Sequence, residues 1–168
     1  MRSLNFFEAC FVKKMQSEET EKQPLIKVER VEYSATESVI KQIRSTVFQQ
    51  EQGVSEELEF DGLDDTAIQL IAYCDRLPAG TARIRDIEEQ TVKIERLAVL
   101  SEYRGRGIGK ALTIAALKIA TDNNYRIAKV HAQEYIKSLY QKLGFEQMGN
   151  VFEEANIPHV KMIKKLND

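Results

Sequence analysis

A glycine-rich segment between two apolar segments constrains the fold of this chain most. Residues 104–110 read Arg-Gly-Arg-Gly-Ile-Gly-Lys, shortly after the apolar run 94–100 and directly before the apolar-periodic segment 111–120. This order predicts a strand, a tight turn and a helix. Glycines let the backbone approach a ligand closely, and the first turn of a helix presents N–H groups without intrahelical partners at the positive end of its dipole. The segment therefore has the parts of a phosphate-binding site.

Two common phosphate-binding motifs do not match this segment. In the dinucleotide motif G-x-G-x-x-G, the third glycine would fall on Lys110 when counted from Gly105, and on Leu112 when counted from Gly107. In a P-loop that ended at Lys110, Arg104 would have to be a glycine. The segment is therefore neither a dinucleotide-binding turn nor a P-loop.

The pattern Arg-x-x-Gly-x-Gly does match a known loop. Arg104, Gly107 and Gly109 follow a predicted strand that ends in Leu97-Ala98-Val99. This arrangement resembles the acetyl-coenzyme A loop of the GNAT superfamily of N-acetyltransferases. The resemblance implies that the pyrophosphate lies on the N–H groups of the loop and that the pantetheine arm pairs with the strand like an extra strand. The cofactor-binding residues it implies are Leu97, Ala98, Val99, Arg104, Gly105, Arg106, Gly107, Ile108, Gly109, Lys110 and Gln133.

A second block of sequence agrees with the same family. The segment 129–133 precedes 138–145, in which Tyr140 stands shortly before Gly144-Phe145. Family members carry a tyrosine at this place in a helix that follows the second strand of the site. Upstream, residues 47–54 with the acidic residues after them, and downstream residues 157–162, resemble the ElaA-type branch of the superfamily. The matches cover roughly residues 25–166.

Hydrophobic periodicity and the family resemblance lead to one fold expectation. We expect a mixed α/β fold with a central, mostly antiparallel, twisted sheet that is splayed between its two central strands, and with helices on both faces. Strands are expected at 25–33, 67–74, 80–87, 92–100, 126–132, 145–152 and 159–163, and helices at 36–50, 107–123 and 135–143.

Length and composition favour a single domain. The chain has 168 residues and is 43% hydrophobic, enough for one core and short for two. We expect a flexible N-terminal extension over 1–23 and the acetyltransferase domain over 24–168, with Met15 as a possible true start. The apolar run near the N-terminus is too short to span a membrane and lacks the features of a signal peptide.

Charge and cysteine content exclude some partners. Lys and Arg total 24 against 26 Asp and Glu, without charge blocks, so neither a nucleic-acid partner nor a membrane partner is expected. Cys10 and Cys74 are far apart and have no metal-ligand spacing, so both are expected to be free thiols. These features and the intracellular coenzyme favour a cytoplasmic location. Monomer and homodimer both stay open.

The expected reaction needs no metal and no covalent nucleophile. An acetyl thioester is already activated, so the enzyme must hold it against an amine, deprotonate the amine, stabilise the oxyanion and protonate the leaving thiolate. By resemblance, Tyr140 is the candidate general acid. Glu95 is the candidate base because, in a regular strand, it shares a face with Leu97 and Val99; the alternative is an ordinary salt-bridged residue. A base that acts through an ordered water also stays open.

Several polar side chains have two readings. Arg104, Arg106 and Lys110 either contact the phosphates or are solvated. His159 is a candidate acceptor-binding residue, and His131 is expected to pack beside the cofactor.

The acidic segment 56–65 either attracts a cationic amine or is a solvated loop, so Glu59 and Asp61 are candidate acceptor-binding residues.

Two functions are therefore considered. The first is transfer of an acetyl group from acetyl-coenzyme A to a primary amine of a small molecule or peptide, by direct attack in a ternary complex. The second is a catalytically silent sensor or scaffold that binds acyl-coenzyme A. The silent protein would need the glycines but not Tyr140, so the tyrosine favours the enzyme.

Overall fold

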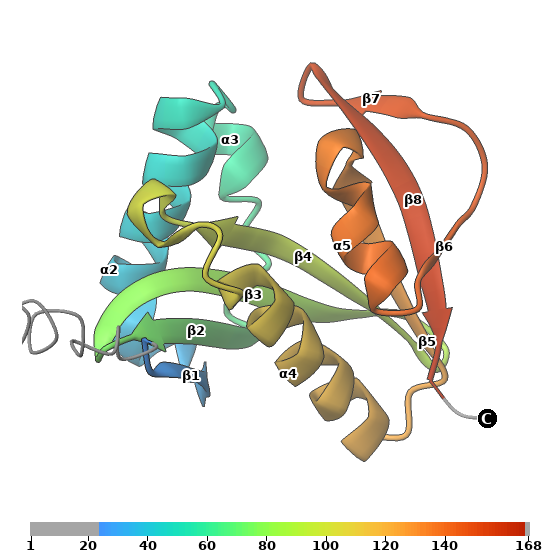
Figure 1. Ribbon diagram of the computed structural model, residues 1–168, viewed down its shortest axis with the longest axis horizontal. Helices are drawn as coiled ribbons and strands as arrows, with labels where there is room; N and C mark the ends of the chain where they lie inside the picture. The colour runs from blue at the N-terminus through green and yellow to red at the C-terminus, as the bar shows by residue number, and fades with distance from the viewer. Residues whose placement is uncertain (1–23, 167–168) are drawn as a thin grey trace, which may run out of the picture.

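The computed structural model describes residues 24–166. The expected extension 1–23, with Met15 and Cys10, lies outside the described residues. Within the described part, eight strands form one sheet in the order β1-β2-β3-β4-β5-β8-β6, with β7 also paired to β8 (Figure 1). The strands are β1 (Ile26–Val31), β2 (Ile68–Cys74), β3 (Leu77–Glu88), β4 (Thr91–Val99), β5 (Ile127–Gln133), β6 (Glu146–Gln147), β7 (Phe152–Glu154) and β8 (Ile157–Lys165). The helical segments are α2 (Tyr33–Arg44), η1 (Ser45–Glu51), α3 (Glu56–Glu59), η2 (Ser101–Tyr103), α4 (Ile108–Asp122), η3 (Glu134–Ile136) and α5 (Lys137–Lys142).

The sheet is splayed between its two central strands, as expected. β4 and β5 are parallel and pair only from Thr91 to Lys93 on one strand and from Ile127 to Lys129 on the other. Beyond these residues β4 continues to Val99 and β5 to Gln133 without pairing to each other. The neighbouring strand pairs are antiparallel. The fold class is thus confirmed, and the splay leaves the free edges of two strands facing each other.

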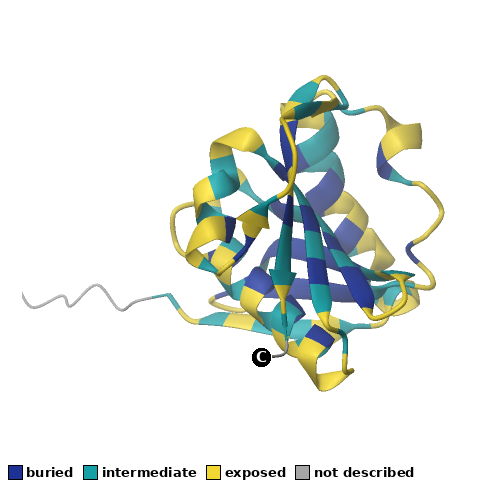
Figure 2. Cartoon of the chain, turned by 90° about the vertical axis from the view of Figure 1, so that its right-hand side faces the viewer, coloured by how far each residue is buried: buried dark blue, intermediate teal, exposed yellow. Residues whose placement is uncertain are grey.

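Helices cover both faces of the β1–β4 half of the sheet. α4 packs its buried residues, among them Leu112 and Ala116, against Leu70 and Ile84 in the larger core. α2 and η1 pack Ile43 and Val47 against Ala98 in a second, smaller core. Figure 2 shows the buried positions gathered along the strands, with exposed residues in helices and loops.

α4 lies very close to β3, and Gly80 makes this approach possible. A Cβ atom added at Gly80 would lie 2.7 Å from the carbonyl oxygen of Ala98 and 3.2 Å from a methyl carbon of Ile108. Only a residue without a side chain fits between β4 and the start of α4. The absence of a side chain at Gly80 therefore lets the N-terminus of α4 lie close to β3 and β4.

Three expected elements differ from the structure. The expected helix 36–50 begins earlier, at Tyr33, and changes to π-type hydrogen bonding at Ser45, which apolar spacing does not reveal. The expected helix 135–143 begins with the 3₁₀ turn η3, so α5 itself is short. The expected strand 145–152 is instead the two short strands β6 and β7, because Gly149 turns the chain between them with φ +77°.

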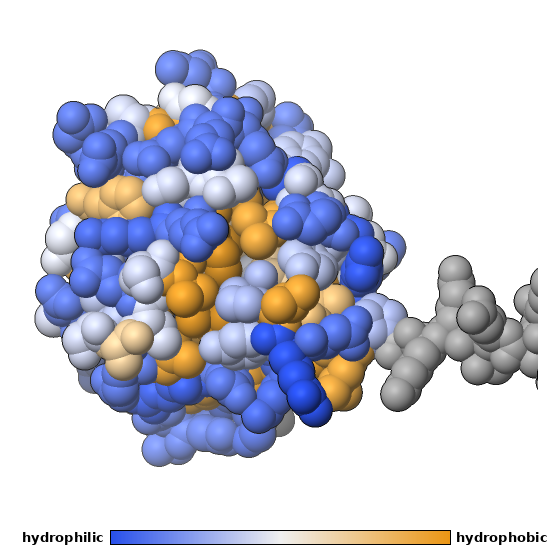
Figure 3. Space-filling view, turned by 90° about the vertical axis from the view of Figure 1, so that its left-hand side faces the viewer, coloured by the Kyte–Doolittle hydropathy of each residue, from blue (hydrophilic) through white to orange (hydrophobic). Residues whose placement is uncertain are grey.

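One side of the molecule has a mixed surface. Figure 3 shows the side that lies on the left in Figure 1, where hydrophobic side chains form a band enclosed by hydrophilic ones. Among residues 24–166, no helix combines the length and the apolar character needed to cross a membrane. Cys74 is buried in the larger core and has no disulfide partner in this part of the chain.

Candidate active site

The glycine-rich turn joins β4 to α4 and leaves amides free at the start of the helix. Gly105 and Gly107 have φ angles of +76° and +86°, which favour glycine, and Gly107 is the N-cap of α4. The N–H of Ala111 donates to the Gly107 carbonyl at 2.9 Å, so the three N–H groups before it have no acceptor within the helix. Because a Cβ at Gly107 would meet nothing within 4 Å, the space in front of these amides is open.

The three cationic side chains of this turn have different roles. Arg104 pairs with Glu51 of η1, and its Nε donates to the Val99 carbonyl at 2.9 Å, so it braces the turn. Arg106 lies over the ring of Tyr103, 5.6 Å from its centroid, and does not line the cavity described below. Lys110 is exposed and lines that cavity. Of the three, Lys110 is the side chain best placed to meet a bound phosphate.

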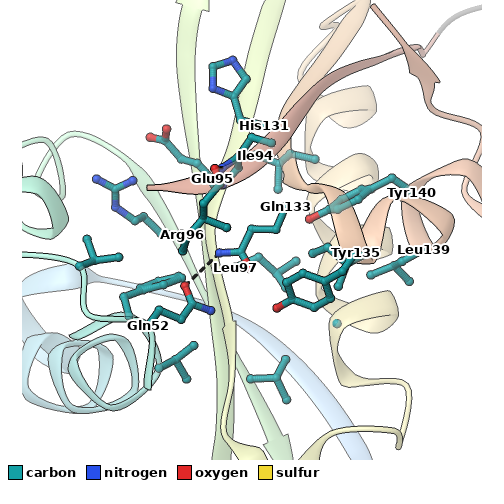
Figure 4. A pocket seen from close by; sticks show the side chains of 18 of the residues that line it. Gln52, Ile94, Glu95, Arg96, Leu97, His131, Gln133, Tyr135, Leu139 and Tyr140 are labelled. Carbon is teal, nitrogen blue, oxygen red and sulfur yellow. Dashed lines mark hydrogen bonds between the residues drawn. The ribbon is translucent and has the colours of Figure 1, made fainter. Parts of the chain in front are cut away.

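A cavity of about 520 Å³ runs from the turn through the splay to α3 and β8. One end is formed by the backbone of the turn and the other by polar side chains of β4, β5 and β7. Figure 4 shows the middle of this cavity, where β4 and β5 lie on either side of the gap. The predicted site residues that line it are Glu59, Glu95, Leu97, Val99, Arg104, Gly105, Gly107, Ile108, Gly109, Lys110, Gln133, Tyr140 and His159.

Two other predicted site residues do not line the cavity with their side chains. Ala98 packs against Ile43 and Val47 on the opposite face of the sheet. Asp61 is held by Arg83, with guanidinium nitrogens 2.7 and 2.6 Å from its two carboxylate oxygens. Together with Arg106, these residues are corrections to the expected side-chain contacts.

β4 is not a regular strand, which changes the position of Glu95. Glu95 is paired with Arg83 of β3, whereas Ala98 is paired with Thr81, so β4 has one residue more than β3 between these pairs. Arg96 has a φ of +52° at this bulge. The bulge breaks the alternation of faces, so the expectation that Glu95 shares a face with Leu97 and Val99 is wrong. Glu95 instead shares the face of Ala98 and Arg83.

The surroundings of Glu95 make it a poor base. Its carboxylate contacts Arg85, is 2.9 Å from Arg83 Nη2, and is 3.2 Å from Lys93 Nζ. Burial raises the pKa of Glu95, but the hydrogen bond from Arg85 and the charges of Arg83 and Lys93 outweigh it and lower the pKa to about 2. A carboxylate with this pKa holds protons weakly at neutral pH, so the salt-bridged alternative describes Glu95 better.

Three carboxylates of the acidic segment, those of Glu59, Asp61 and Asp64, are paired with arginines, whereas Glu56, Glu57 and Asp65 are exposed. Arg44 is fully buried at the end of α2, contacts Glu59 and lies 2.6 Å from Asp64 Oδ1. Burial raises the pKa of Glu59, and the charges of Arg44 and Arg96 oppose this shift. Burial also raises the pKa of Asp64, but the hydrogen bond and charge of Arg44 outweigh it and the net pKa is lowered.

A second buried arginine completes this cluster. Arg83 Nη1 lies 3.1 Å from Asp64, so Arg83 joins Asp61, Asp64 and Glu95 in one group. The hydrogen bonds from Arg83 lower the pKa of Asp61 well below its usual range. We call this set the buried ionic cluster: Arg44, Glu59, Asp61, Asp64, Arg83 and Glu95. Its two arginines were missed in the sequence because their partners lie 12 to 22 residues away along the chain.

Tyr140 points its hydroxyl toward the gap between β4 and β5 (Figure 4). The residue is 4% exposed, and its ring packs edge-on against Phe145 with centroids 5.5 Å apart. Burial raises the pKa of Tyr140, which keeps the hydroxyl protonated at neutral pH. The structure therefore places a protonated hydroxyl in the cavity, and the role of Tyr140 as the general acid stays a prediction.

Polar residues of β5, β7 and β8 line the far side of the cavity. Gln133 Nε2 donates to Gln52 Oε1 at 2.9 Å and so connects β5 to the end of η1 (Figure 4). His131 Nδ1 is 2.8 Å from Glu154 Oε2. His159 Nδ1 is 2.7 Å from the Ile157 carbonyl oxygen. Gln52 and Glu154 were not predicted, because no local motif marks them.

Comparison with known proteins agrees with this geometry. The family model described as acetyltransferase (GNAT) domain matches residues 28–166. A Bacillus subtilis protein provisionally named an acetyltransferase is 38% identical over 127 residues, which cover 74% of this chain and 86% of the relative. Escherichia coli ElaA has 25% sequence identity and a TM-score of 0.75, covering 83% of this chain and 99% of ElaA.

A Bacillus subtilis acetyltransferase solved in complex with CoA has the same fold. Its TM-score is 0.69 at 19% identity, and the match covers 85% of this chain and 100% of that chain. The family match extends over nearly all the described residues and includes the glycine-rich turn, the splay and Tyr140. The chain belongs to the GNAT family of acetyltransferases.

Proposed function

We propose that this acetyltransferase moves an acetyl group from acetyl-coenzyme A to a primary amine of a small molecule or peptide, by direct attack in a ternary complex. The observation that carries the proposal is the continuous cavity, which connects the free amides of the turn with the hydroxyl of Tyr140 through the splay. Membership in the GNAT family supports acetyl-coenzyme A as the coenzyme, as does the CoA complex of a protein with the same fold.

The proposed coenzyme runs from the glycine-rich turn along β4 toward the splay. The turn lies just after the C-terminal end of β4, so a pyrophosphate on the amides of residues 108–110 places the pantetheine arm along Val99 and then Leu97. The unpaired edge of β4 can hydrogen-bond this arm as a neighbouring strand would. The thioester then lies near the point where β4 and β5 separate, within reach of the Tyr140 side of the cavity.

Tyr140 is the proposed general acid. Its protonated hydroxyl can donate to the thiolate that leaves when the carbon–sulfur bond breaks. A phenol with a raised pKa does not lose its proton before the reaction, so the acid is in the right state throughout the neutral range.

The acceptor approaches from the polar end of the cavity. Glu59 and His159 line that end and stay candidate acceptor-binding residues, although Glu59 is already paired with Arg44 and Arg96. Because Glu59, Asp61 and Asp64 are already paired with arginines, these three carboxylates do not select the amine by their charge. The proposed acceptor is therefore a primary amine, without a choice of one compound. The proposed acetyltransferase domain covers residues 24–168, and the proposed location is the cytoplasm.

Calorimetric titration with acetyl-coenzyme A, followed by thiol release in the same sample, tests the proposal. The amines would be spermidine, kanamycin, free lysine and a short peptide with a free N-terminus. Saturable binding with amine-dependent release of free thiol is the expected result. Binding without release for every amine would favour the silent sensor, and absence of binding would contradict the proposed coenzyme.

A further inference from the structure

We infer that His131, held by Glu154, is the general base that deprotonates the acceptor amine. The inference rests on the proposed transfer reaction and names a residue for a step that the fold alone does not assign. Both side chains line the same cavity as Tyr140, and His131 Nδ1 lies 2.8 Å from Glu154 Oε2.

His131 stands at the closed end of the splay, where the thioester is expected. The last paired residues of the two central strands are Lys93 and Lys129. His131 comes two residues after Lys129 and Glu95 two residues after Lys93, so both flank the first unpaired positions on one face of the sheet. Figure 4 shows His131 at the level of Glu95, beyond Gln133 as seen from the turn. His131 therefore lines the cavity between its polar end and the expected position of the thioester.

The contact with Glu154 fixes which nitrogen can accept a proton. An ionised carboxylate only accepts hydrogen bonds, so Nδ1 of the neutral imidazole carries the hydrogen and Nε2 keeps its lone pair. The ring also packs edge-on against Phe152, with centroids 5.0 Å apart. The hydrogen bond from His131 lowers the pKa of Glu154, which keeps its carboxylate ionised. A positioned imidazole with a free Nε2 is the arrangement that general-base catalysis uses.

The charged and titratable groups around the pair come from two strands, β4 and β8. Lys93 and Glu95 belong to β4, and Glu95 is occupied by its own cations. His159 and Lys161 belong to β8, and Lys161 lies opposite His131 in the strand register. Lys93 and His159 also favour the ionised form of Glu154. Glu154 is therefore the acidic partner that is available to orient His131.

Two other residues of the cavity are weaker candidates. Glu95 binds protons too weakly, with a pKa of about 2. His159 is 8% exposed, and its Nδ1 contacts a backbone carbonyl oxygen rather than a carboxylate. A carbonyl stabilises a new imidazolium less than a carboxylate does, so His131 is the better base of the two histidines.

The proton balance of the reaction is complete with His131 and Tyr140. His131 Nε2 takes one proton from the acceptor ammonium, and the free amine forms the new carbon–nitrogen bond. As the carbon–sulfur bond breaks, Tyr140 gives a proton to the leaving thiolate. The nitrogen of the new amide loses a second proton to solvent, and solvent returns a proton to the Tyr140 phenolate. His131 then releases its proton to water. The products are the acetylated amine, free coenzyme A and one proton.

The pH dependence of transfer tests the base. For the wild type with the most reactive amine of the panel, we expect an acidic limb in kcat/KM between pH 5 and 8, the range in which histidine changes charge. The His131→Ala variant is expected to lose this acidic limb, and its kcat/KM should fall about 100-fold or more. Added imidazole should restore part of the lost rate. The acetyl-coenzyme A dissociation constant of this variant should stay within about twofold of the wild type. His159→Gln should keep the limb, whatever its effect on the rate.

Nitrogen-15 NMR of the histidine side chains tests the orientation without an acceptor. The His131 ring should show the Nδ1-protonated form in the wild type and a mixture of tautomers in Glu154→Ala. A wild-type ring protonated on Nε2 would overturn the inference. An unchanged acidic limb in His131→Ala would overturn the base while the transferase stands. Absence of thiol release by the wild type with every amine would instead overturn the transfer reaction, and the base with it.

Discussion

The two ends of the cavity are built in different ways. The coenzyme end consists of backbone, with two left-handed glycines and the first amides of α4. The acceptor end consists of polar and charged side chains. Two of them, Glu59 and Glu95, belong to the buried ionic cluster. A phosphate bound at the coenzyme end would meet backbone N–H groups that the fold already holds in place. An amine at the acceptor end would meet side chains whose pKa values depend on neighbouring charges.

This difference explains what each end can tolerate. A backbone site is disturbed by any bulky side chain that enters it, but it contributes little to the stability of the fold. Substitutions in a buried ionic cluster do the opposite, because removing one charged group leaves its partners in a buried site with one partner fewer. The comparison therefore predicts that substitutions at one end affect ligand binding and that substitutions at the other affect folding.

Gly107→Glu is expected to have the largest effect. The new side chain adds bulk, a negative charge and backbone strain where the pyrophosphate belongs, so acetyl-coenzyme A binding should become undetectable by calorimetry. Gly149→Glu is the matched control, because Gly149 also has a positive φ and open space but lies outside the cavity. Equal affinity in both variants would show that the turn does not hold the phosphates.

Arg83→Ala should produce the next largest effect, on stability. Removal of this guanidinium takes one partner from the buried carboxylates of Asp64 and Glu95, with an expected cost of about 3–5 kcal/mol. Urea denaturation measures the loss. Lys118→Ala removes an exposed pair with Asp122 and should change the midpoint very little. Similar midpoints for the two variants would contradict the importance of the cluster.

Tyr140→Phe should slow transfer without weakening binding. Loss of the acid is expected to lower kcat about 100-fold, while the dissociation constant of acetyl-coenzyme A changes less than about twofold. Tyr135→Phe removes a hydroxyl from a residue of the same cavity that is 74% exposed, and it should retain most of the activity. Parallel loss of binding and rate in Tyr140→Phe would make the tyrosine a packing residue.

Acid should weaken the fold through the same cluster, with a smaller effect. Glu95, Asp61 and Asp64 have lowered pKa values, so the stability they contribute is present above their unfolded values near pH 4 and is lost as the pH falls toward 2. The raised pKa of Glu59 acts in the opposite direction and offsets a part. Urea midpoints between pH 6 and 2 should fall less steeply for Glu95→Gln than for the wild type. A parallel fall would assign the acid sensitivity elsewhere.

The same contrast explains how much the sequence could reveal. The glycine-rich turn, the order of strands and helices and the splay depend on local spacing or on a family pattern, and the structure agrees with them. Tyr140 lines the cavity, and its role as the acid stays a prediction. The bulge at Arg96 and the π-helical segment η1, which continues α2, leave no signal in hydrophobic periodicity. The extra residue of the bulge was enough to move Glu95 to the other face.

The buried ionic cluster was the part least open to prediction. Glu59, Asp61 and Asp64 lie together in a segment that the sequence left open as an attractant for a cationic amine or a solvated loop. Their partners Arg44 and Arg83 lie far from it along the chain, on a helix and on a strand. Only the packing of α2 against the sheet brings these charges together. The contact of His131 with Glu154 is similar, since 23 residues separate them along the chain.

Hydrogen–deuterium exchange with acetyl-coenzyme A tests the central claim most directly, namely that the coenzyme lies in the splay. Peptides that cover residues 94–100 and 105–112 should exchange more slowly when the coenzyme is bound, because the unpaired edge of β4 and the first amides of α4 gain hydrogen-bond partners. Peptides of β1, which lies at the other edge of the sheet, should not change. Saturable binding that leaves 94–100 and 105–112 unprotected would contradict the account.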